Sequence, residues 1–338
     1  MSNAEVNNSF STHSTSNVSN STTDFKYKPF KNAVPELVPF SVAIILANSF
    51  VFVLFLKKKS IRTPANYLLL SLALCDFFTG CVNIPLTIMA FTQVVPYAKL
   101  PDVFYLVAVL HNFTAVVTGY HILVITAERY LLFVWEVRRP ASKNAILKIL
   151  GGVWGASAII AIVPFFWKSQ LYAKDPKAST LQTAHAIFCL AAVFLLPYTF
   201  IIYAYAVMFK AIKKTRRQME TMQNGSEDQA GCSSHEKRCL VIFVTMGTLY
   251  LVCWLPWFTL SLIFSLDASD GNGVHGTVSH VVAIVRYMTS VLNPVLYTFF
   301  KRDFFIAFKQ VILRRRFEER VSFSALETAR NSSRDEVY

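Results

Sequence analysis

The chain has 338 residues, of which 54% are hydrophobic and only 16% are charged. A soluble chain of this length needs more charge to cover its surface, so the composition excludes an ordinary soluble protein. The formal net charge of +13 would suit nucleic acid. Basic residues that flank apolar segments are, however, signals of membrane topology first, so their placement decides their meaning.

The N-terminal segment, residues 1–36, begins with a stretch rich in Ser, Thr and Asn that runs to Asp24. It has no apolar core, so it is not a secretory signal, and we expect a disordered tail. It contains three Asn-x-Ser/Thr tripeptides, which predict glycosylation if the tail is extracellular. The three acceptor residues are Asn7, Asn17 and Asn20.

Seven apolar segments follow within residues 37–300, each long enough for a bilayer, which a helix of about 20 residues crosses. They predict an all-α membrane protein with a seven-transmembrane helix bundle. Their approximate bounds are Leu37–Leu56, Asn66–Phe91, Phe104–Phe133, Ile146–Trp167, Ala184–Phe209, Cys239–Leu266 and Val278–Phe300. The third segment carries several polar residues, so we expect it at the centre of the bundle.

The placement of Lys and Arg predicts the orientation of the bundle. If the N-terminal tail is outside, the inner segments hold 25 Lys and Arg residues and the outer segments hold seven. Such an excess predicts an extracellular N-terminus and a cytoplasmic C-terminus. The basic residues therefore mark the cytoplasmic face, and nucleic acid is excluded as a partner.

Residues 301–316 predict a short amphipathic helix after the last span. Phe304, Phe305 and Phe308 share one helical face, and three arginines follow at Arg314–Arg316. We expect this helix to lie on the inner leaflet and to bind membrane lipids. The remaining residues, 317–338, predict a cytoplasmic tail.

Ionisable and polar residues inside the spans follow helical spacing. His111 and Arg129 are 18 residues apart, which is about five turns of helix, so both point the same way. In the seventh span Arg286 begins a set spaced i, i+4, i+7 and i+11, and its other members are Ser290, Asn293 and Tyr297. Charged groups at membrane depth cost about 2.5–3.5 kcal/mol, so these faces should turn to the interior of the bundle. Deep prolines in spans five and six, Pro197 and Pro256, predict helix kinks.

A set of short motifs occurs in order along the seven spans. They are Asn48, Leu72-Ala73-Leu74-Cys75-Asp76, Glu128-Arg129-Tyr130, Trp154, Pro197 with Tyr205, Cys253-Trp254-Leu255-Pro256, and Asn293-Pro294-Val295-Leu296-Tyr297. The ordered set resembles the rhodopsin-like (class A) G-protein-coupled receptors over about residues 37–310.

This resemblance implies a switch at the cytoplasmic end. Arg129 would be held at rest by Glu128 and Glu236, although Glu236 could instead be a solvated charge. Releasing Arg129 would let span six swing out and open a groove for a helix of a G protein. The switch residues carried over from the family are Glu128, Arg129, Tyr130, Glu236, Tyr205, Asn293, Pro294 and Tyr297.

The resemblance also implies a sodium ion as an allosteric ligand, and no other cofactor. The ion would lie in an all-oxygen pocket of Asp76, Thr118, Ser290 and Asn293. Trp254 would sit beneath the ligand, next to the Pro256 kink. Arrestin and receptor kinases would act through the C-terminal tail.

The chain departs from the family pattern in its outer half. Phe104 stands where the family has a disulfide cysteine, and the segment Lys168–Thr183 has no Cys, so we predict no disulfide and a less constrained outer loop. His111 replaces the Asp of amine receptors, and Tyr287 replaces the Lys of retinal-binding opsins. The chain therefore lacks both the Asp that binds a monoamine and the Lys that attaches retinal in those receptors. Tyr250 replaces the usual Phe and adds a buried hydroxyl that needs a partner.

The outer pocket then contains His111, Arg286 and Tyr287 above Trp254. A cation at this depth requires an anion, and no Asp or Glu lies in the outer half of any span. One reading is that Arg286 and His111 bind a carboxylate or phosphate of an acidic small molecule or lipid. The other reading is that Arg286 is satisfied by the protein itself, through hydrogen bonds to Tyr side chains and carbonyls or through a loop acid, for which the candidates are Asp102, Asp267 and Asp270.

These observations predict a plasma-membrane receptor that converts binding of an extracellular ligand into activation of a heterotrimeric G protein. A non-signalling decoy or partner subunit is the alternative, although the Glu128-Arg129-Tyr130 motif is intact. A transporter fits less well, because no repeat relates the two halves. No nucleophile–base set or metal-ligand cluster is present in the sequence, so we do not expect an enzyme.

Overall fold

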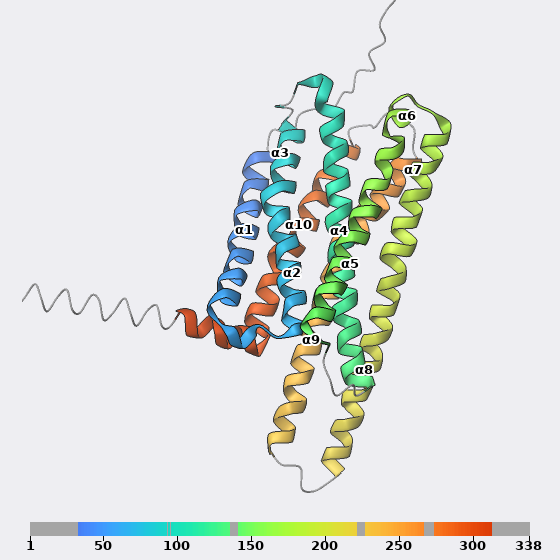
Figure 1. The fold of residues 1–338 in the computed structure, drawn as a ribbon. Coiled ribbons are helices and arrows are strands. Elements are labelled where there is room, and N and C mark those ends of the chain that lie inside the picture. Colours follow the sequence, from blue (N-terminus) through green and yellow to red (C-terminus); the bar gives the residue numbers. More distant parts are fainter. Residues whose placement is uncertain are drawn as a thin grey trace, which may run out of the picture.

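The computed structural model describes residues 33–92, 94, 96–135, 141–221, 227–266 and 274–312. Within these ranges the regular structure is helical and contains no strand. The helices stand side by side in one elongated bundle (Figure 1). We call the end of the bundle that carries the short helix α6 (Lys168–Tyr172) the upper end, and the opposite end the lower end.

The described residues contain seven helical segments that are long and apolar enough to cross a membrane, which confirms the predicted seven-helix bundle. Four spans are built mainly from one helix, and they are α1 (Ala33–Lys57), α4 (Leu100–Val134), α9 (Glu227–Leu266) and α10 (Val274–Phe300). The second span joins α2 (Pro64–Phe78), η2 (Thr79–Asn83) and α3 (Ile84–Thr92). The fourth joins α5 (Lys143–Ile162), η4 (Val163–Trp167) and α6, and the fifth joins α7 (Pro176–Phe188), η5 (Cys189–Leu195) and α8 (Leu196–Thr221). Two short 3-10 turns, η1 (Lys59–Ile61) and η3 (Tyr97–Lys99), lie in connections.

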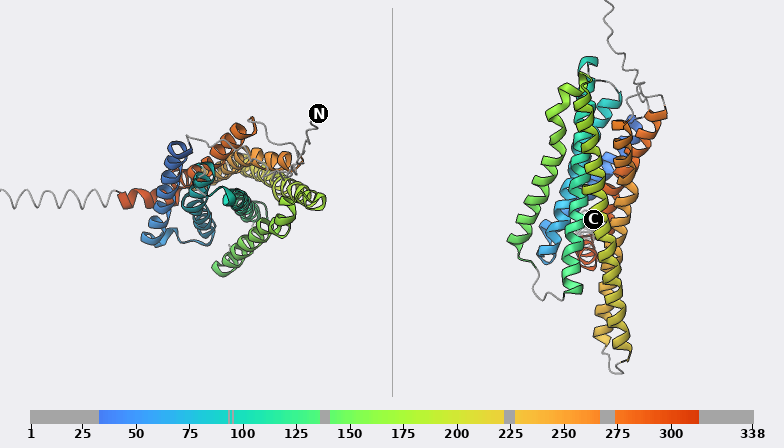
Figure 2. Two further views of the ribbon diagram at one scale, coloured as in Figure 1. Left: turned by 90° about the horizontal axis from the view of Figure 1, so that it is seen from above. Right: turned by 90° about the vertical axis from the view of Figure 1, so that its right-hand side faces the viewer.

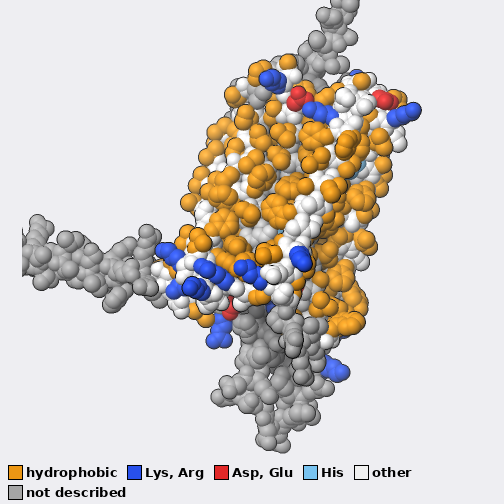
Figure 3. Space-filling view, in the orientation of Figure 1, with side chains coloured by type: hydrophobic (Ala, Val, Ile, Leu, Met, Phe, Trp, Pro, Cys, Tyr) orange, Lys and Arg blue, Asp and Glu red, His pale blue; other side chains and the backbone are white. Residues whose placement is uncertain are grey.

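The outside of the bundle is apolar around its middle. Figure 3 shows hydrophobic side chains over the central part of this face, with Lys and Arg gathered toward its two ends. Large apolar side chains there are well exposed, among them Leu46, Ile159, Phe166 and Leu196. A water-soluble protein rarely exposes so continuous an apolar surface, whereas a hydrocarbon layer stabilises it.

The third span, α4, occupies the centre of the bundle, as its polar residues predict. It packs against α2, α3, α5, α8 and α9, and the view along the bundle shows it enclosed by other helices (Figure 2). Two of its buried hydroxyls are satisfied within the helix, since Thr114 donates to the carbonyl of Leu110 and Thr126 to that of Ile122. Polar side chains paired in this way can be buried at little cost.

The two deep prolines are accommodated differently. Pro256 lies inside the continuous helix α9. Pro197 lies just after the π-helical turn η5, and Pro85 in the second span follows the π-helical turn η2 in the same way. A wider π turn relieves the clash between a proline ring and the preceding turn, so the fifth span continues through Pro197.

A helix over residues 302–312 follows the last span, inside the predicted range 301–316. Phe304 is fully buried and meets the ring of Tyr297 at 5.5 Å between centroids. Phe308 packs edge-on against Phe50 at 5.6 Å and also contacts Phe299. These rings anchor the helix across the lower ends of α1 and α10.

Candidate functional site

The upper half of the bundle contains a buried polar cluster around Arg286 of α10. The Arg286 side chain is only 2% exposed, and its Nη2 lies 2.8 Å from Nε2 of His111 on α4. The hydroxyl of Tyr287 lies 2.9 Å from the same His111 nitrogen and 2.9 Å from the hydroxyl of Thr87 on α3. The predicted pocket residues from spans three and seven are therefore in direct contact, and Thr87 adds the second span to the cluster.

The guanidinium of Arg286 is covered by aromatic rings. Its Cζ lies 4.5 Å from the ring centroid of Trp257 on α9 and 5.0 Å from that of Tyr287. The indole N–H of Trp257 donates to Oδ1 of Asn112 on α4 at 3.0 Å. A cation held over ring faces is stabilised by about 0.5–2 kcal/mol, more when water is excluded. Trp257 thus links the cluster to α9, and the sequence motifs do not reveal this role.

The cluster leaves donors unused. Among the described residues, Nε and Nη1 of Arg286 and Nδ1 of His111 are buried without a hydrogen-bond partner. Buried polar atoms of this kind are rare in proteins and need an explanation. One of the loop acids considered as a partner is engaged elsewhere, because Asp102 pairs with Lys168 at 2.6 Å. The other two candidates, Asp267 and Asp270, lie outside the described residues.

A second polar cluster surrounds Asp76 in the middle of the bundle. Nδ2 of Asn293 donates to the Asp76 carboxylate at 3.2 Å, and Ser290 interacts with the same carboxylate. Nδ2 of Asn48 on α1 donates to the carbonyl of Ser290 at 3.2 Å. The remaining predicted member of the sodium pocket, Thr118, has its hydroxyl 4.0 Å from Sγ of Cys75.

The chemistry of this cluster fits a hard cation. Oδ1 of Asn48 and Oδ1 of Asn293 are buried acceptors without a hydrogen-bond partner among the described residues. These amide oxygens and the Asp76 carboxylate are of the ligand type that hard cations prefer. Asn48 is therefore an additional candidate ligand.

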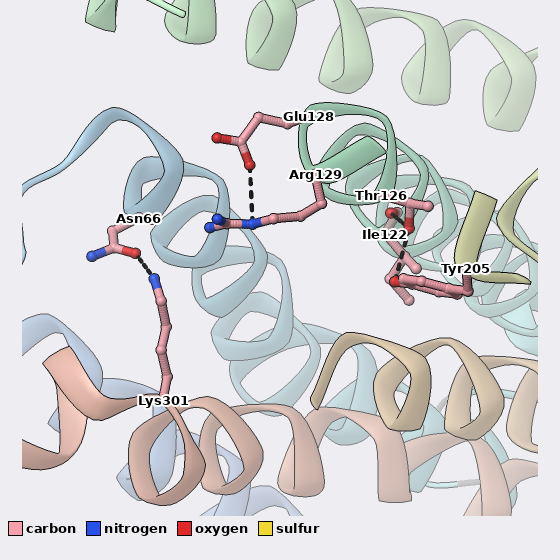
Figure 4. A network of polar contacts seen from close by, with 7 residues as sticks. All are labelled: Asn66, Ile122, Thr126, Glu128, Arg129, Tyr205 and Lys301. Atoms are coloured by element: carbon pink, nitrogen blue, oxygen red, sulfur yellow. Dashed lines mark hydrogen bonds and ion pairs between the residues drawn. The ribbon is translucent and has the colours of Figure 1, made fainter. Parts of the chain in front are cut away.

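The predicted switch residues lie at the lower end (Figure 4). Nε of Arg129 is 3.3 Å from Oε2 of Glu128, and the guanidinium lies over the ring of Phe243 on α9, at 5.3 Å from its centroid. The contact between Arg129 and Glu128 is an ion pair by distance, but it lacks hydrogen-bond alignment, since neither atom has a hydrogen-bond partner among the described residues. The side chain of Glu236 lies outside the described residues, so its contact with Arg129 is not described.

The other switch residues occupy the surroundings of Arg129. The hydroxyls of Tyr205 on α8 and Thr126 on α4 are hydrogen bonded at 2.9 Å (Figure 4). The ring of Tyr130 packs against Phe200 and Tyr203 of α8. Tyr297 is fully buried below Asn293 and Pro294 on α10, and its hydroxyl has no partner among the described residues.

A polar contact that the motifs do not predict closes the lower end. The ammonium of Lys301 donates to Oδ1 of Asn66 at the start of α2, and Asn66 in turn donates to the carbonyl of Ile61 at 2.8 Å (Figure 4). Both side chains are buried. The contact joins the end of α10 to the connection between α1 and α2.

Trp254 and Tyr250 lie on α9 between the upper and lower clusters. Trp254 is buried, and its indole nitrogen has no partner among the described residues. Tyr250 lies one turn below it and donates to the carbonyl of Ala115 on α4 at 3.0 Å. The partner that the sequence requires for this hydroxyl is thus a backbone carbonyl of the third span.

The segment Lys168–Thr183 differs from its expected form. Instead of a loosely held loop, the structure has helix α6 and the first turns of α7. The ammonium of Lys168 pairs with Asp102 and lies 5.4, 5.8 and 5.6 Å from the ring centroids of Tyr105, Phe165 and Tyr172, respectively. This group of five residues, which we call the Lys168 clamp, ties α6 to the start of α4. The expectation took only covalent links into account, whereas these non-covalent contacts also constrain the segment. That the segment is less constrained than in disulfide-linked members of the family stays a prediction.

Some predicted residues cannot be placed. The four cysteines whose side chains the structure describes, Cys75, Cys81, Cys189 and Cys253, are free. The glycosylation candidates Asn7, Asn17 and Asn20 lie outside the described residues, and so do Arg314–Arg316 and the tail residues 317–338. Three or more His, Cys, Asp or Glu side chains that could hold a metal ion do not gather anywhere in the described ranges.

A seven-helix membrane bundle with a polar cluster in each half and a buried carboxylate between them defines a transmembrane receptor. Residues 47–297 match the family described as "7 transmembrane receptor (rhodopsin family)", and the chain belongs to this family. It is therefore a multi-pass membrane protein and a G-protein-coupled receptor, with an extracellular ligand and a G protein as partners, and it is not an enzyme.

Several curated receptors are similar to the chain over most of its length. Human 5-hydroxytryptamine receptor 1D is 24% identical over 80% of this chain and 86% of its own length. Guinea pig 5-hydroxytryptamine receptor 1E is 26% identical over 88% of this chain and 98% of its own. Human neuromedin-U receptor 2 is 24% identical over 81% of this chain and 70% of its own. The names of these relatives refer to two different ligands, 5-hydroxytryptamine and neuromedin-U, so the similarity defines the family and leaves the ligand open.

Proposed function

We propose that this receptor acts at the plasma membrane, binds an acidic small molecule or lipid at Arg286, and activates a heterotrimeric G protein at its lower end. The observation that carries the ligand assignment is the buried guanidinium of Arg286 with two nitrogens unpaired among the described residues. An uncompensated buried cation is costly, and an anionic ligand removes this cost.

The orientation of the receptor rests on its charge distribution. Along the sequence, the segments on the same side of the spans as the N-terminal tail hold seven Lys and Arg residues, and the segments on the other side hold 25. The positive-inside rule then makes the lower end cytoplasmic and the upper end extracellular. With this orientation the tail of residues 1–36 is available for glycosylation, and the tail of residues 317–338 is available to receptor kinases and arrestin.

The chemistry of the upper cluster argues against an amine ligand. 5-Hydroxytryptamine, after which two of the relatives are named, carries a protonated amine at neutral pH. In this chain the facing positions hold His111 and Arg286, and Nε2 of His111 lies 2.8 Å from Nη2 of Arg286. A protonated amine placed beside Arg286 would be repelled, because two positive charges at close range disfavour each other and a desolvated site has no water to screen them. An acid is the ligand class that this environment stabilises.

Trp257 offers a route from the ligand to α9. An anion bound to Arg286 would reduce the positive charge that faces the Trp257 ring, and so weaken the cation–π contact. Trp257 directly follows Pro256, where the backbone of α9 lacks one hydrogen bond. The upper part of α9 can therefore respond to the ligand while the lower part releases Arg129 from its contact with Phe243.

The test replaces Arg286 by Ala and measures second-messenger output against a panel of acidic metabolites and lipids. We expect active acids to lose at least about 100-fold in potency, because a charge-assisted contact in a buried site is worth about 3 kcal/mol or more. Lys177→Ala, which removes an exposed cation at the same end, is the matched control. Unchanged potency of Arg286→Ala would rule out the assignment.

Additional variants test whether a loop acid, Asp267 or Asp270, is the partner of Arg286 instead of a ligand. If Asp267 or Asp270 is the partner of Arg286, then Asp267→Asn or Asp270→Asn should destabilise the receptor and create a response to added carboxylates. If Arg286 binds the ligand, both variants should keep the potency of the wild-type receptor. A receptor that activates no G protein with any acid would instead fit a decoy or partner subunit.

We also propose that a sodium ion binds at Asp76, held by that carboxylate together with Ser290, Asn293 and Thr118. The unpaired Oδ1 atoms of Asn293 and Asn48 support a cation at this position. Asp76→Asn should make the agonist response insensitive to sodium, which is measured by replacing sodium with choline in the assay buffer. Sodium sensitivity that persists in this variant would exclude the pocket.

A further inference from the structure

We propose that the ligand group at Arg286 carries a single negative charge, as a carboxylate does, and that His111 sets this limit by remaining neutral. The inference rests on the proposed function, in which an anion binds at Arg286, and it decides between a carboxylate and a doubly charged phosphate.

The hydrogen bonds define the protonation of His111. A guanidinium has only donors, so the 2.8 Å contact between Nη2 of Arg286 and Nε2 of His111 requires Nε2 to accept. A histidine nitrogen that accepts carries no proton, so the ring is neutral and its proton is on Nδ1. Protonating Nε2 would place two donors and two positive charges against each other at this distance.

The neighbouring hydroxyls agree with this assignment. Thr87 donates to the carbonyl of Asn83 at 2.7 Å, so the single hydroxyl hydrogen of Tyr287 is shared between its two 2.9 Å contacts, to the hydroxyl oxygen of Thr87 and to Nε2 of His111. Tyr287 is then an acceptor for Nη2 of Arg286 at 3.4 Å. Whenever the Tyr287 hydrogen points to Thr87, the lone pair on Nε2 of His111 is available to Arg286.

The cluster therefore holds one positive charge. In the described part of the chain, the buried Lys and Arg side chains are Arg286 and Lys301, and Lys301 lies at the lower end beside Asn66. A monoanion at Arg286 gives a neutral pair in a desolvated site. A dianion would leave one negative charge buried without compensation, which is strongly unfavourable.

The number of free donors also matches a carboxylate. Nε and Nη1 of Arg286 carry three N–H groups between them, and Nδ1 of His111 carries a fourth. A carboxylate has two oxygens with about four lone-pair sites, so it can use this set without leaving acceptors unpaired. A primary amide of the same shape would bring two donors of its own against an all-donor environment.

The test uses two matched probe sets and purified receptor. One set is octanoate, octanamide and octyl phosphate, and the other is 3-phenylpropanoate, 3-phenylpropanamide and phenethyl phosphate. At pH 7.4 the phosphates are largely dianions, because their second pKa is about 6. Binding is measured by the thermal shift of the receptor in detergent, and function by nucleotide exchange on a G protein.

We expect at least one carboxylate to bind about ten-fold or more tightly than its amide and its phosphate, because an uncompensated buried charge and unpaired buried donors are both costly. Arg286→Gln should remove this binding. His111→Gln, which supplies a neutral acceptor to Arg286, should keep the preference for the carboxylate. His111→Lys, which adds a second charge, should shift the preference toward the phosphate.

The matched control is His185→Gln, a buried histidine on α7 that bonds the carbonyl of Ile160 at 2.9 Å and should leave all affinities unchanged. A phosphate that binds the wild-type receptor as tightly as its carboxylate, with dependence on Arg286, would overturn this inference alone. Absence of any Arg286-dependent binding in both sets would count against the proposed function and, with it, against the inference.

A measurement without ligand keeps the inference testable on its own. Nitrogen-15 NMR of receptor labelled at histidine, assigned with His111→Gln, reports which ring nitrogen carries the proton. We expect the neutral Nδ1–H form at pH 7.4. A doubly protonated His111 ring would contradict the inference, since the site would then hold two positive charges.

Discussion

Gly119 shows at the scale of one residue how α4 and α9 approach each other. Tyr250 of α9 reaches the carbonyl of Ala115 on α4, and this brings its ring against the Cα of Gly119. A Cβ at Gly119 would lie 2.9 Å from Cζ of Tyr250 and closer still to its hydroxyl. The glycine is therefore required by the tyrosine that replaces the usual phenylalanine.

Gly119→Ala should destabilise the receptor by about 1–3 kcal/mol, because overpacking forces Tyr250 away from its carbonyl partner. Thermal unfolding of the purified receptor measures the effect. Gly152→Ala on α5 is the matched control, since a Cβ there meets nothing within 4 Å and should be neutral or slightly stabilising. Equal stability of Gly119→Ala and the wild type would contradict this view of the contact.

The sequence predicts single residues of the two polar clusters, because an ionisable group is rare inside an apolar span and marks a buried or functional position. Arg286, His111 and Asp76 were found in this way, and all three are buried. Trp257 was not found, since an aromatic residue in an apolar helix carries no signal of its own. Its contact with Arg286 depends on how α9 and α10 pack.

At the scale of the element, the Lys168 clamp links α6 to the start of α4 by non-covalent contacts. It combines an ion pair of 2.6 Å with three aromatic rings around one ammonium, and the hydroxyl of Tyr172 also donates to the carbonyl of Pro101 at 3.1 Å. Each contact is modest, but together they hold α6 against the start of α4 without a covalent bond.

Lys168→Ala should lower the stability of the receptor by about 1 kcal/mol, since it removes an ion pair and several cation–π contacts near the surface. Loss of activity on heating the purified receptor measures the change. Lys177→Ala removes an exposed cation of the nearby helix α7 and serves as the control. If both variants behave like the wild type, the clamp does not hold the segment.

At the scale of the whole molecule, the polar clusters occupy successive levels of one bundle. The Arg286 cluster joins α3, α4, α9 and α10 in the upper half, and the Asp76 cluster joins α1, α2 and α10 below it. The contacts of Arg129 join α4 to α9 at the lower end. A movement of α9 therefore affects both ends of the bundle, because this helix contacts Arg286 in the upper half and Arg129 at the lower end.

Arg129→Ala should abolish G-protein activation while surface expression stays largely intact, because the arginine is partly exposed at the lower end and supports little of the core. Nucleotide exchange on the G protein and surface labelling of cells are the two measurements. Lys148→Ala, which removes an exposed basic residue of α5, is the control. Normal coupling in Arg129→Ala would refute the switch assignment.

The sequence by itself determined the seven spans, the polar faces of the third and seventh, and the family. These features are local: hydrophobic length and helical spacing depend on neighbours along the chain, so they can be read without coordinates. The tertiary structure alone decided that Arg286 bonds His111 and lies over Trp257, that Tyr250 reaches Ala115, and that Lys168 pairs with Asp102. These contacts join residues far apart in sequence, and the rotation of each helix about its axis selects them.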